Sequence, residues 1–221
     1  MTSALSAAEA MDRMYRHQRY IYDLTRKHYL LGRDELIRRL RPAPGETVLE
    51  VGCGTARNLI VAAKLYPQAR LFGVDVSNEM LAFANEQLRR DGLTGRVSLA
   101  RGSAEDFDPA ALFGVAAFDR VFVSYSLSMI PRWREALDHA LALVAPGGRL
   151  AVVDFGDQER LPKPFRAVLR RWLALFDVTP RGDLEAALRD AAARHGAALT
   201  VTRPYLGYAQ LAVLTAPRRA A

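Results

Sequence analysis

Apolar and polar positions along this chain follow two alternating patterns, short continuous apolar runs and longer amphipathic stretches. The apolar runs predict buried strands at residues 47–51, 70–74, 97–100, 118–123 and 149–154. The stretches between them predict helices at residues 57–65, 78–91 and 133–144. Buried strands that alternate with helices at this spacing are typical of a parallel sheet. The pattern therefore predicts an α/β fold with helices on both faces of the sheet.

The pattern differs at the N-terminal end. Residues 9–41 have a helical pattern that breaks at Gly32, and arginines and tyrosines are interleaved along it. The segment Pro42-Ala43-Pro44-Gly45 then separates it from the first strand. We expect residues 1–44 to form an N-terminal helical lid that contributes to substrate binding, and residues 45–221 to form the main domain of a single compact unit.

Beyond Asp154 the sequence predicts two more helices and two more strands. The first helix has apolar residues at helical spacing, namely Phe165, Val168, Leu169, Trp172, Leu173 and Phe176. A second helix is predicted at residues 183–195 and ends at Gly196. Strands at residues 198–204 and 207–215 complete a seven-stranded sheet.

Composition limits the protein class. The 221 residues are 50% apolar, enough for one sizeable core, and the single cysteine excludes a disulfide framework and a cysteine-rich metal site. We find no signal peptide and no apolar stretch of the ~20 residues that span a bilayer. We therefore expect a cytoplasmic protein, soluble or peripheral at the inner membrane face.

The chain is basic, with a net charge of +7 that comes almost entirely from arginine. Such a charge favours an anionic partner, either nucleic acid, an anionic membrane or an acidic substrate. A general bias of composition toward arginine explains the same charge without any partner. The four histidines have no metal-ligand spacing, and we expect no metal.

The chemistry is concentrated at the end of the first strand. Glu50 ends an apolar run, Gly52-Cys53-Gly54 follows, and a helix begins near Arg57. Asp75 closes the second strand about twenty residues later. Glycines allow a ligand close to the backbone, and a later carboxylate can hold ribose hydroxyls. This pairing predicts a nucleotide-type site at the carboxyl edge of the sheet.

A dinucleotide-binding dehydrogenase is the structural neighbour to exclude. It would favour Gly-x-Gly-x-x-Gly, whereas Arg57 stands where the last glycine belongs. Instead the chain resembles the class I S-adenosylmethionine-dependent methyltransferases. The resemblance rests on four segments: Glu50–Gly54, Gly73–Asp75, Gly102–Asp106 and Leu143–Gly148. Ala56 departs from it by replacing a third glycine, which is tolerable if that residue does not need a positive φ.

The resemblance implies a Rossmann-like, mostly parallel seven-stranded sheet with an antiparallel last strand, and S-adenosylmethionine (SAM) as cofactor. The glycines would lie near the methionine part of SAM and Asp75 would accept hydrogen bonds from both ribose hydroxyls. Glu50 would position the turn or reach the amino group through water, or else simply cap the next helix. The predicted cofactor-binding residues are Glu50, Gly52, Cys53, Gly54, Asp75, Val76, Met80, Ser103, Ala104, Glu105 and Ser124.

Several roles within this site stay open. Met80 packs against adenine or belongs to the core. The adenine amine is read by Ser103, Glu105 or Asp106. Cys53 is better explained as a small buried turn residue than as a nucleophile. The reacting centre is expected after the fourth strand, at Ser124 and Tyr125, where the motifs of nucleobase methylation are missing.

The flanks add a closer resemblance. Residues Tyr22–Asp34, Val178–Arg181 and Tyr205–Gln210 look like bacterial diacylglyceryl-homoserine N-methyltransferases. That family trimethylates the amine of a lipid headgroup to give a betaine lipid. The resemblance implies a lipid headgroup as substrate and transient contact with an anionic membrane surface.

For this reaction we name candidates from the lid. Tyr22, Tyr29 and Tyr125 are candidate catalytic residues that would position the amine, although bracing of helices explains each tyrosine more simply. Arg26 and Arg33 are candidates for binding the substrate carboxylate.

Three alternatives remain. One is a C- or O-methyltransferase for a quinone or another small molecule, which shares the core motifs. Another is an RNA methyltransferase, although no RNA-binding appendage is recognisable and we expect no nucleic-acid partner. The last is a cofactor-binding protein without catalysis, because binding residues alone do not establish turnover.

Overall fold

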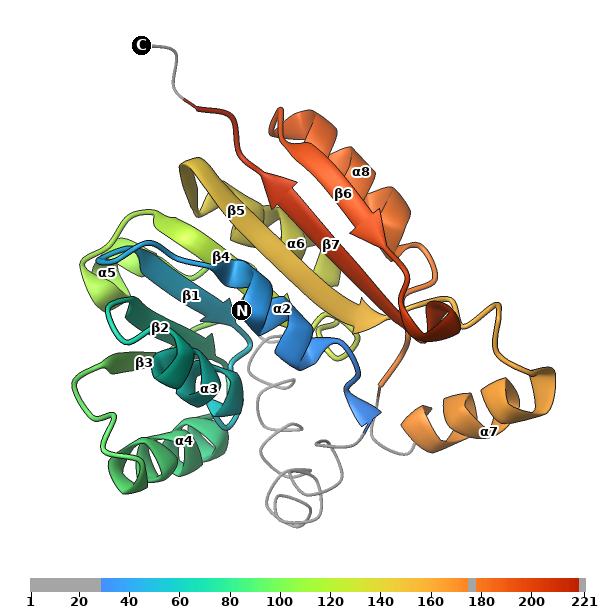
Figure 1. Cartoon of the computed structure of the whole chain (residues 1–221), viewed down its shortest axis with the longest axis horizontal. Helices are drawn as coiled ribbons and strands as arrows, with labels where there is room; N and C mark the ends of the chain where they lie inside the picture. The colour runs from blue at the N-terminus through green and yellow to red at the C-terminus, as the bar shows by residue number, and fades with distance from the viewer. Residues whose placement is uncertain (1–28, 175–177, 219–221) are drawn as a thin grey trace.

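The computed structural model describes residues 29–174 and 178–218 of the chain. Their strands form one seven-stranded sheet in the order β3-β2-β1-β4-β5-β7-β6 (Figure 1). The strands are β1 (Thr47–Val51), β2 (Arg70–Asp75), β3 (Val97–Arg101), β4 (Phe118–Ser124), β5 (Val144–Phe155), β6 (Ala198–Thr202) and β7 (Ala209–Thr215).

The sheet is mostly parallel. Strands β1 to β5 pair in parallel, whereas β7 pairs antiparallel with both β5 and β6. The order reverses beside β1, and ligands of such sheets bind at the carboxyl ends of the strands near that reversal. The predicted Rossmann-like fold, including its antiparallel last strand, is confirmed.

Helices cover both faces of the sheet, as predicted (Figure 1). Helices α2, α3 and α4 contribute to one apolar cluster, and α6 and α8 contribute to a second cluster on the opposite face. The helices are α2 (Arg33–Leu40), α3 (Arg57–Leu65), α4 (Asn78–Arg90), α5 (Pro109–Phe113), α6 (Trp133–Ala142), α7 (Lys163–Ala174) and α8 (Leu184–Arg194), with a 3₁₀ turn η1 at Tyr205–Gly207.

The short helix α5 is absent from the sequence prediction. Its N-terminal residue Asp108 accepts hydrogen bonds from the N–H groups of Ala110 and Ala111, Pro109 takes the first helical position, and Gly114 ends it. These are strong start and stop signals. A helix of five residues is too short to show a periodic apolar pattern, so the sequence did not predict it despite these signals.

Helix α7 uses its apolar stripe mainly for the core. Leu169 and Leu173 are 9% and 0% exposed and join the same cluster as α2. Val168 is 68% exposed and points away from that cluster. Phe176 lies outside the described residues. No helix in the described part of the chain is long and apolar enough to cross a membrane.

The described part of the N-terminal segment belongs to the core. Helix α2 begins after Gly32, whose φ of 87° is left-handed, so the predicted break is present. Leu36 and Ile37 are both 0% exposed and pack in the cluster that also contains Val153. Residues 1–28, which carry most of the predicted lid, lie outside the described residues.

We predict that Ile37→Ala lowers the free energy of unfolding by about 2–5 kcal/mol, because it leaves a cavity between α2 and the sheet. Leu65→Ala is the matched control, since Leu65 is 48% exposed, and should cost less than about 1 kcal/mol. Urea unfolding measures both. A loss below 1 kcal/mol in Ile37→Ala would mean that α2 is not part of the cooperative unit.

Candidate functional site

The turn after β1 brings backbone close to open space at the carboxyl edge of the sheet. Gly52 and Gly54 have φ of 73° and 52°, a conformation that glycine adopts without strain. A side chain at Gly52 would lie 2.6 Å from Cβ of Ser126, in the loop after β4. At Gly54 a side chain would meet nothing within 4 Å. Gly52 therefore allows loop packing, whereas Gly54 leaves room for a ligand.

Asp75 connects the two loops that border this space. Its Oδ2 accepts a hydrogen bond from the N–H of Gly54 at 2.7 Å, and its Oδ1 accepts one from the N–H of Ser77 at 3.0 Å. The residue is 8% exposed. A carboxylate can accept about four hydrogen bonds, so holding both loops is compatible with the predicted binding of ribose hydroxyls.

Glu50 lies below the turn and is 1% exposed. Its Oε1 accepts a hydrogen bond from Nδ2 of Asn58 at 2.6 Å, whereas Oε2 is buried without a partner among the described residues. Burial raises the pKa of Glu50 to about 8, and the charges of Arg33 and Arg57 limit the rise. A buried carboxylate with one unpaired oxygen is suited to a cationic ligand group.

The start of α3 corrects one sequence expectation. Ala56, the residue before the helix, has a φ of 58°. This position therefore does adopt the left-handed conformation, contrary to the condition under which alanine was expected to be tolerated. Such a conformation costs roughly 1–2 kcal/mol for a residue other than glycine. The turn before the helix stabilises this conformation, because the N–H of Ala56 donates to the carbonyl of Cys53 at 2.9 Å.

Cys53 is buried beside the two acidic groups. Burial, with Asp75 and Glu50 close by, raises the pKa of its thiol well above the usual value. The thiol therefore stays protonated, and a protonated thiol is a poor nucleophile. This agrees with its interpretation as a turn residue.

The loops after β2 and β3 form the other wall. Ser77 caps α4 by accepting from the N–H of Met80, which is 5% exposed, and the carbonyl of Val76 accepts from Arg101. The Ser103 hydroxyl donates to the Glu105 carboxylate. Ala104 packs against the apolar cluster of α6 and α8. These contacts place the predicted adenine-side residues together, and the residue that reads adenine stays open.

The end of β4 is strained. Tyr125 has a φ of 56° although it is not glycine, and its N–H donates to the carbonyl of Val153 at 2.8 Å. Its hydroxyl donates to the carbonyl of Leu31, which ties β4 to the N-terminal segment. Burial raises the pKa of Tyr125 well above its usual value, so it is a poor proton acceptor. Ser124 beside it has a buried hydroxyl without a partner among the described residues.

Aromatic rings form a layer behind Tyr125. Phe155, at the end of β5, contacts the rings of Tyr125 and Tyr208 at centroid distances of 4.7 and 5.9 Å and stacks on Tyr29 at 6.5 Å. Trp172 of α7 meets Tyr29 edge-on at 4.6 Å. The layer, which we call the aromatic layer, joins the sheet edge, α7 and the N-terminal segment.

The two arginines predicted to bind substrate differ in outcome. Arg33 is 6% exposed, and its charge acts on buried Glu50. Its charge acts on Tyr125 as well, so Arg33 lies near both the cofactor residues and the end of β4. Arg26 lies outside the described residues, as does Tyr22. Their roles, like that of Arg33 toward substrate, stay predictions.

Two supporting residues were missed by the sequence analysis. Asp154 is 0% exposed and accepts from the N–H of Ser128 at 3.1 Å, which fixes the loop after β4. Arg181 donates to the carbonyls of Leu127 and Ile130 in the same loop. An acidic residue at the end of an apolar run, as at Glu50 and Asp75, was a signal available for Asp154. Nothing local marked Arg181, because its partners lie about fifty residues away.

The described residues contain no group of three or more His, Cys, Asp or Glu side chains arranged to hold a metal ion. The groups that are present suit an organic ligand instead. Open space over Gly54, the Asp75 carboxylate and the unpaired oxygen of Glu50 fit the amino acid and ribose parts of SAM.

Comparisons with known proteins agree with this fit. A family model described as "Methyltransferase domain" matches residues 42–185. "O-methyltransferase cnsE" of Penicillium expansum is 32% identical over 155 residues, which cover 69% of this chain and 54% of that protein. "Demethylmenaquinone methyltransferase" of Listeria welshimeri is 29% identical over 154 residues, covering 68% and 63%. The chain thus matches less than two thirds of the length of either relative.

A solved structure shows the same fold. The geranyl diphosphate C-methyltransferase of Streptomyces coelicolor, solved with Mg2+, geranyl diphosphate and S-adenosyl-L-homocysteine, superposes with a TM-score of 0.62. The match covers 85% of this chain and 78% of that one at 16% identity. At this identity the likeness concerns the fold.

We predict that Glu50→Gln removes a pH dependence of stability. The pKa of Glu50 is raised from 4.5 to about 8 in the folded protein. The folded protein binds this proton more tightly than the unfolded chain does, which adds to the free energy of unfolding. That contribution is fully present below pH 4.5 and is lost as the pH rises through about 8. The variant stays neutral, and its amide can donate to Oδ1 of Asn58, which has no partner among the described residues.

Unfolding of both proteins by urea from about pH 4 to 9 tests this prediction. We expect the variant to gain on the parent progressively as the pH rises, by on the order of 1–3 kcal/mol at the alkaline end. Asp154, whose pKa is raised to about 6, titrates in both proteins and cancels in the difference. A difference that stays constant over this range would contradict the prediction.

Proposed function

The chain belongs to the methyltransferase domain family, and from this premise we propose that it transfers a methyl group from SAM to an oxygen or carbon atom of a small, largely apolar molecule. The observation that carries the proposal is the aromatic layer beside the carboxyl edge, next to the predicted cofactor residues. Phe155, Tyr125 and Tyr208 are buried in this layer, whereas Tyr29 and Trp172 are only partly buried. These two rings offer apolar surface and stacking to a flat acceptor such as a quinol or phenol. The name of one relative gives oxygen as the methylated atom, and the name of the other gives demethylmenaquinone as the acceptor.

Different residues of the chain would bind different parts of SAM. The backbone at Gly54 would give the cofactor close approach, Asp75 would accept hydrogen bonds from its ribose, and the buried carboxyl of Glu50 would accept one from its amino group. When bound, SAM supplies an electrophilic methyl group on a sulfonium. The enzyme then needs mainly to hold the acceptor in line, which supplies much of the catalysis for an activated donor. We propose that Ser124, whose buried hydroxyl has no partner among the described residues, orients a polar atom of the acceptor.

The second candidate is N-methylation of a lipid amine, which the flanking segments favour. Rings around Tyr29 also suit a cationic amine through cation–π attraction. Against it stands the burial of Arg33, which is 6% exposed and so presents little of its side chain to a substrate carboxylate. We therefore rank this candidate below the small-molecule reaction.

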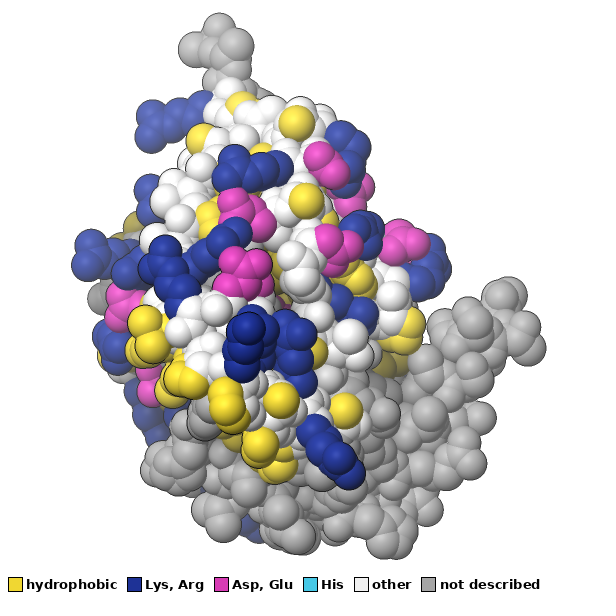
Figure 2. All heavy atoms as spheres, turned by 90° about the vertical axis from the view of Figure 1, so that its right-hand side faces the viewer, with side chains coloured by type: hydrophobic (Ala, Val, Ile, Leu, Met, Phe, Trp, Pro, Cys, Tyr) yellow, Lys and Arg dark blue, Asp and Glu magenta, His cyan; other side chains and the backbone are white. Residues whose placement is uncertain are grey.

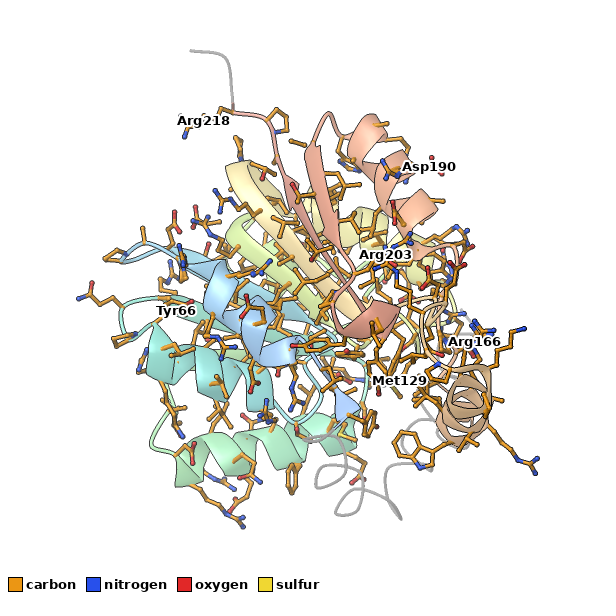
Figure 3. The ribbon with its side chains drawn as sticks, turned by 45° about the vertical axis from the view of Figure 1, so that its right-hand side comes forward. Tyr66, Met129, Arg166, Asp190, Arg203 and Arg218 are labelled. Atoms are coloured by element: carbon orange, nitrogen blue, oxygen red, sulfur yellow. The ribbon has the colours of Figure 1, made fainter. Side chains whose placement is uncertain are left out.

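We also propose that one face contacts an anionic membrane, where apolar acceptors and lipids both reside. Val168 on α7 and Tyr205 and Leu206 on η1 are 68%, 49% and 57% exposed. Helix α7 reaches the η1 turn through Gln158, which accepts from Arg170 and donates its N–H to the carbonyl of Gly207. Figure 2 shows hydrophobic side chains beside arginine and lysine on this side of the molecule. Arg166 extends outward from α7 (Figure 3).

Product masses separate the candidate reactions. The purified protein is incubated with SAM and, in parallel, with a naphthoquinol, a simple phenol and diacylglyceryl-homoserine in mixed micelles. We expect methylation of the quinol or phenol, and Trp172→Ala should raise the KM for that acceptor while SAM affinity is unchanged. Leu65→Ala, at an exposed residue outside the aromatic layer and the proposed membrane face, is the control. Stepwise addition of methyl groups to the lipid amine alone would replace the proposal by the second candidate.

Cosedimentation with vesicles tests the membrane contact. Leu206→Asp should reduce binding to vesicles that contain phosphatidylglycerol, because an exposed apolar contact is replaced by a charge that the lipid repels. Leu112→Asp is the control, since Leu112 is 38% exposed on α5. Equal vesicle binding by the parent and Leu206→Asp would refute the assignment of this face.

A further inference from the structure

A groove of about 310 Å³ lies on the face that carries α2, at the amino edge of the sheet. Its rim is formed by Arg39 and Arg41 at the end of α2, by Arg120 near the start of β4 and by Arg149 of β5. Its floor is apolar and comes from α2, β5 and β7. In Figure 1 no helix lies in front of β7 beside α2, so this part of the sheet is open.

The groove is remote from the methyl-transfer site. The predicted cofactor residues follow the carboxyl ends of the strands, whereas Arg120 lies near the amino end of β4 and Arg149 is its register partner on β5. In Figure 3 Met129, in the loop after β4, lies at one end of the sheet and Tyr66, after α3, lies at the other. The groove belongs to the Tyr66 end, because Tyr66 donates to the carbonyl of Ile37 at 3.0 Å and accepts from the N–H of Arg41.

Two of the four arginines are neutralised by the protein itself. Nε of Arg39 lies 2.7 Å from Oε1 of Glu35. Arg120 pairs with Glu46 at 3.0 Å and also donates to the carbonyl of Leu40 at 2.9 Å. These two side chains are fixed parts of the rim.

The other two arginines keep their charge. Arg41 and Arg149 have no carboxylate within ion-pair distance among the described residues, and both are exposed. Arg149 stands next to Arg120 in the register of neighbouring strands, and because Arg120 is paired with Glu46, the charge of Arg149 is the uncompensated one of the two. An anion bound to Arg149 and Arg41 would gain charge-assisted hydrogen bonds.

The floor determines what kind of anion fits. Leu36 and Leu211 are 0% and 3% exposed and form a packed apolar base, with Val213 half-buried beside them. A volume near 310 Å³ lies at the lower end of the range for small-molecule sites. An inorganic anion would leave the apolar floor of the groove in contact with water. An uncharged apolar molecule would leave Arg41 and Arg149 without an anionic partner.

We propose that this groove binds a small amphipathic anion, with its carboxylate or phosphate on Arg41 and Arg149 and its apolar body on the floor at Val213. A second copy of this chain fits less well, because a symmetric contact would bring the same uncompensated arginines together. A nucleic acid fits less well because an apolar floor offers nothing to a phosphodiester chain. The ligand would bind independently of SAM and of the methyl acceptor.

Titration calorimetry with decanoate as the probe, on the full chain and below the micelle concentration, tests the proposal. We expect one site in the parent protein. The double variant Arg41→Gln/Arg149→Gln should bind decanoate at least about tenfold more weakly, the loss expected for charge-assisted hydrogen bonds. Val213→Glu should also weaken binding, by placing a like charge on the floor. Arg38→Gln is the matched control, since Arg38 lies on the same helix outside the groove and pairs with Glu35.

Two further probes define the ligand class. Decanol and inorganic phosphate should each bind much more weakly than decanoate. Decanol has no anionic group for the arginines, and phosphate has no apolar body for the floor. Thermal unfolding of every variant confirms the fold. We expect the fold to survive because the guanidinium groups of Arg41 and Arg149 hold no carboxylate partner among the described residues, and the ion pair of Arg38 with Glu35 is exposed. The proposal is overturned if the double variant binds decanoate like the parent, if phosphate binds as tightly as decanoate, or if Val213→Glu instead dissolves a dimer without affecting decanoate.

Discussion

The site depends on one buried carboxylate at the topological reversal of the sheet. Asp75 accepts the N–H of Gly54 from the loop after β1 and the N–H of Ser77 from the loop after β2. The carbonyl of Asp75 also accepts the N–H of Gly102, at the start of the loop after β3. Burial of a carboxylate or of a backbone N–H group costs free energy unless the group is hydrogen-bonded. The contacts between Asp75 and these N–H groups therefore remove the cost for both partners. Three loops from strands distant in sequence thereby form one binding surface.

Much of this could be predicted from the sequence because it is local. Strand β1 was predicted with its observed limits, Thr47–Val51, since a short apolar run followed by a glycine turn is an unambiguous pattern. Glu50 and Asp75 were recognised as strand-end carboxylates. The positive φ of Ala56 was not foreseen, because alanine gives no sign of it and the loop geometry imposes it. The contact of the Tyr125 hydroxyl with Leu31 spans 94 residues, and no local pattern encodes such a contact.

The two edges of the sheet carry different chemistry. At the carboxyl edge, acidic groups and aromatic rings lie side by side, and Tyr125 is held in a strained conformation by its contacts with Val153 and Leu31. Strain of this kind persists only where surrounding contacts fix it, and it is common at functional sites. At the amino edge, arginines meet the apolar floor beside β7. The basic composition thus contributes to a defined groove, which composition alone could not distinguish from a general arginine bias.

The account depends most directly on the carboxylate of Asp75. Calorimetric titration of SAM into the parent protein and into Asp75→Asn, with Asp91→Asn as an exposed control, measures its contribution. The account predicts at least about tenfold weaker binding in Asp75→Asn, since charge-assisted hydrogen bonds are worth roughly 1.5–3 kcal/mol, and parental affinity in the control. Circular dichroism confirms that the variant is folded. Equal affinity of folded Asp75→Asn and the parent for SAM would contradict the account.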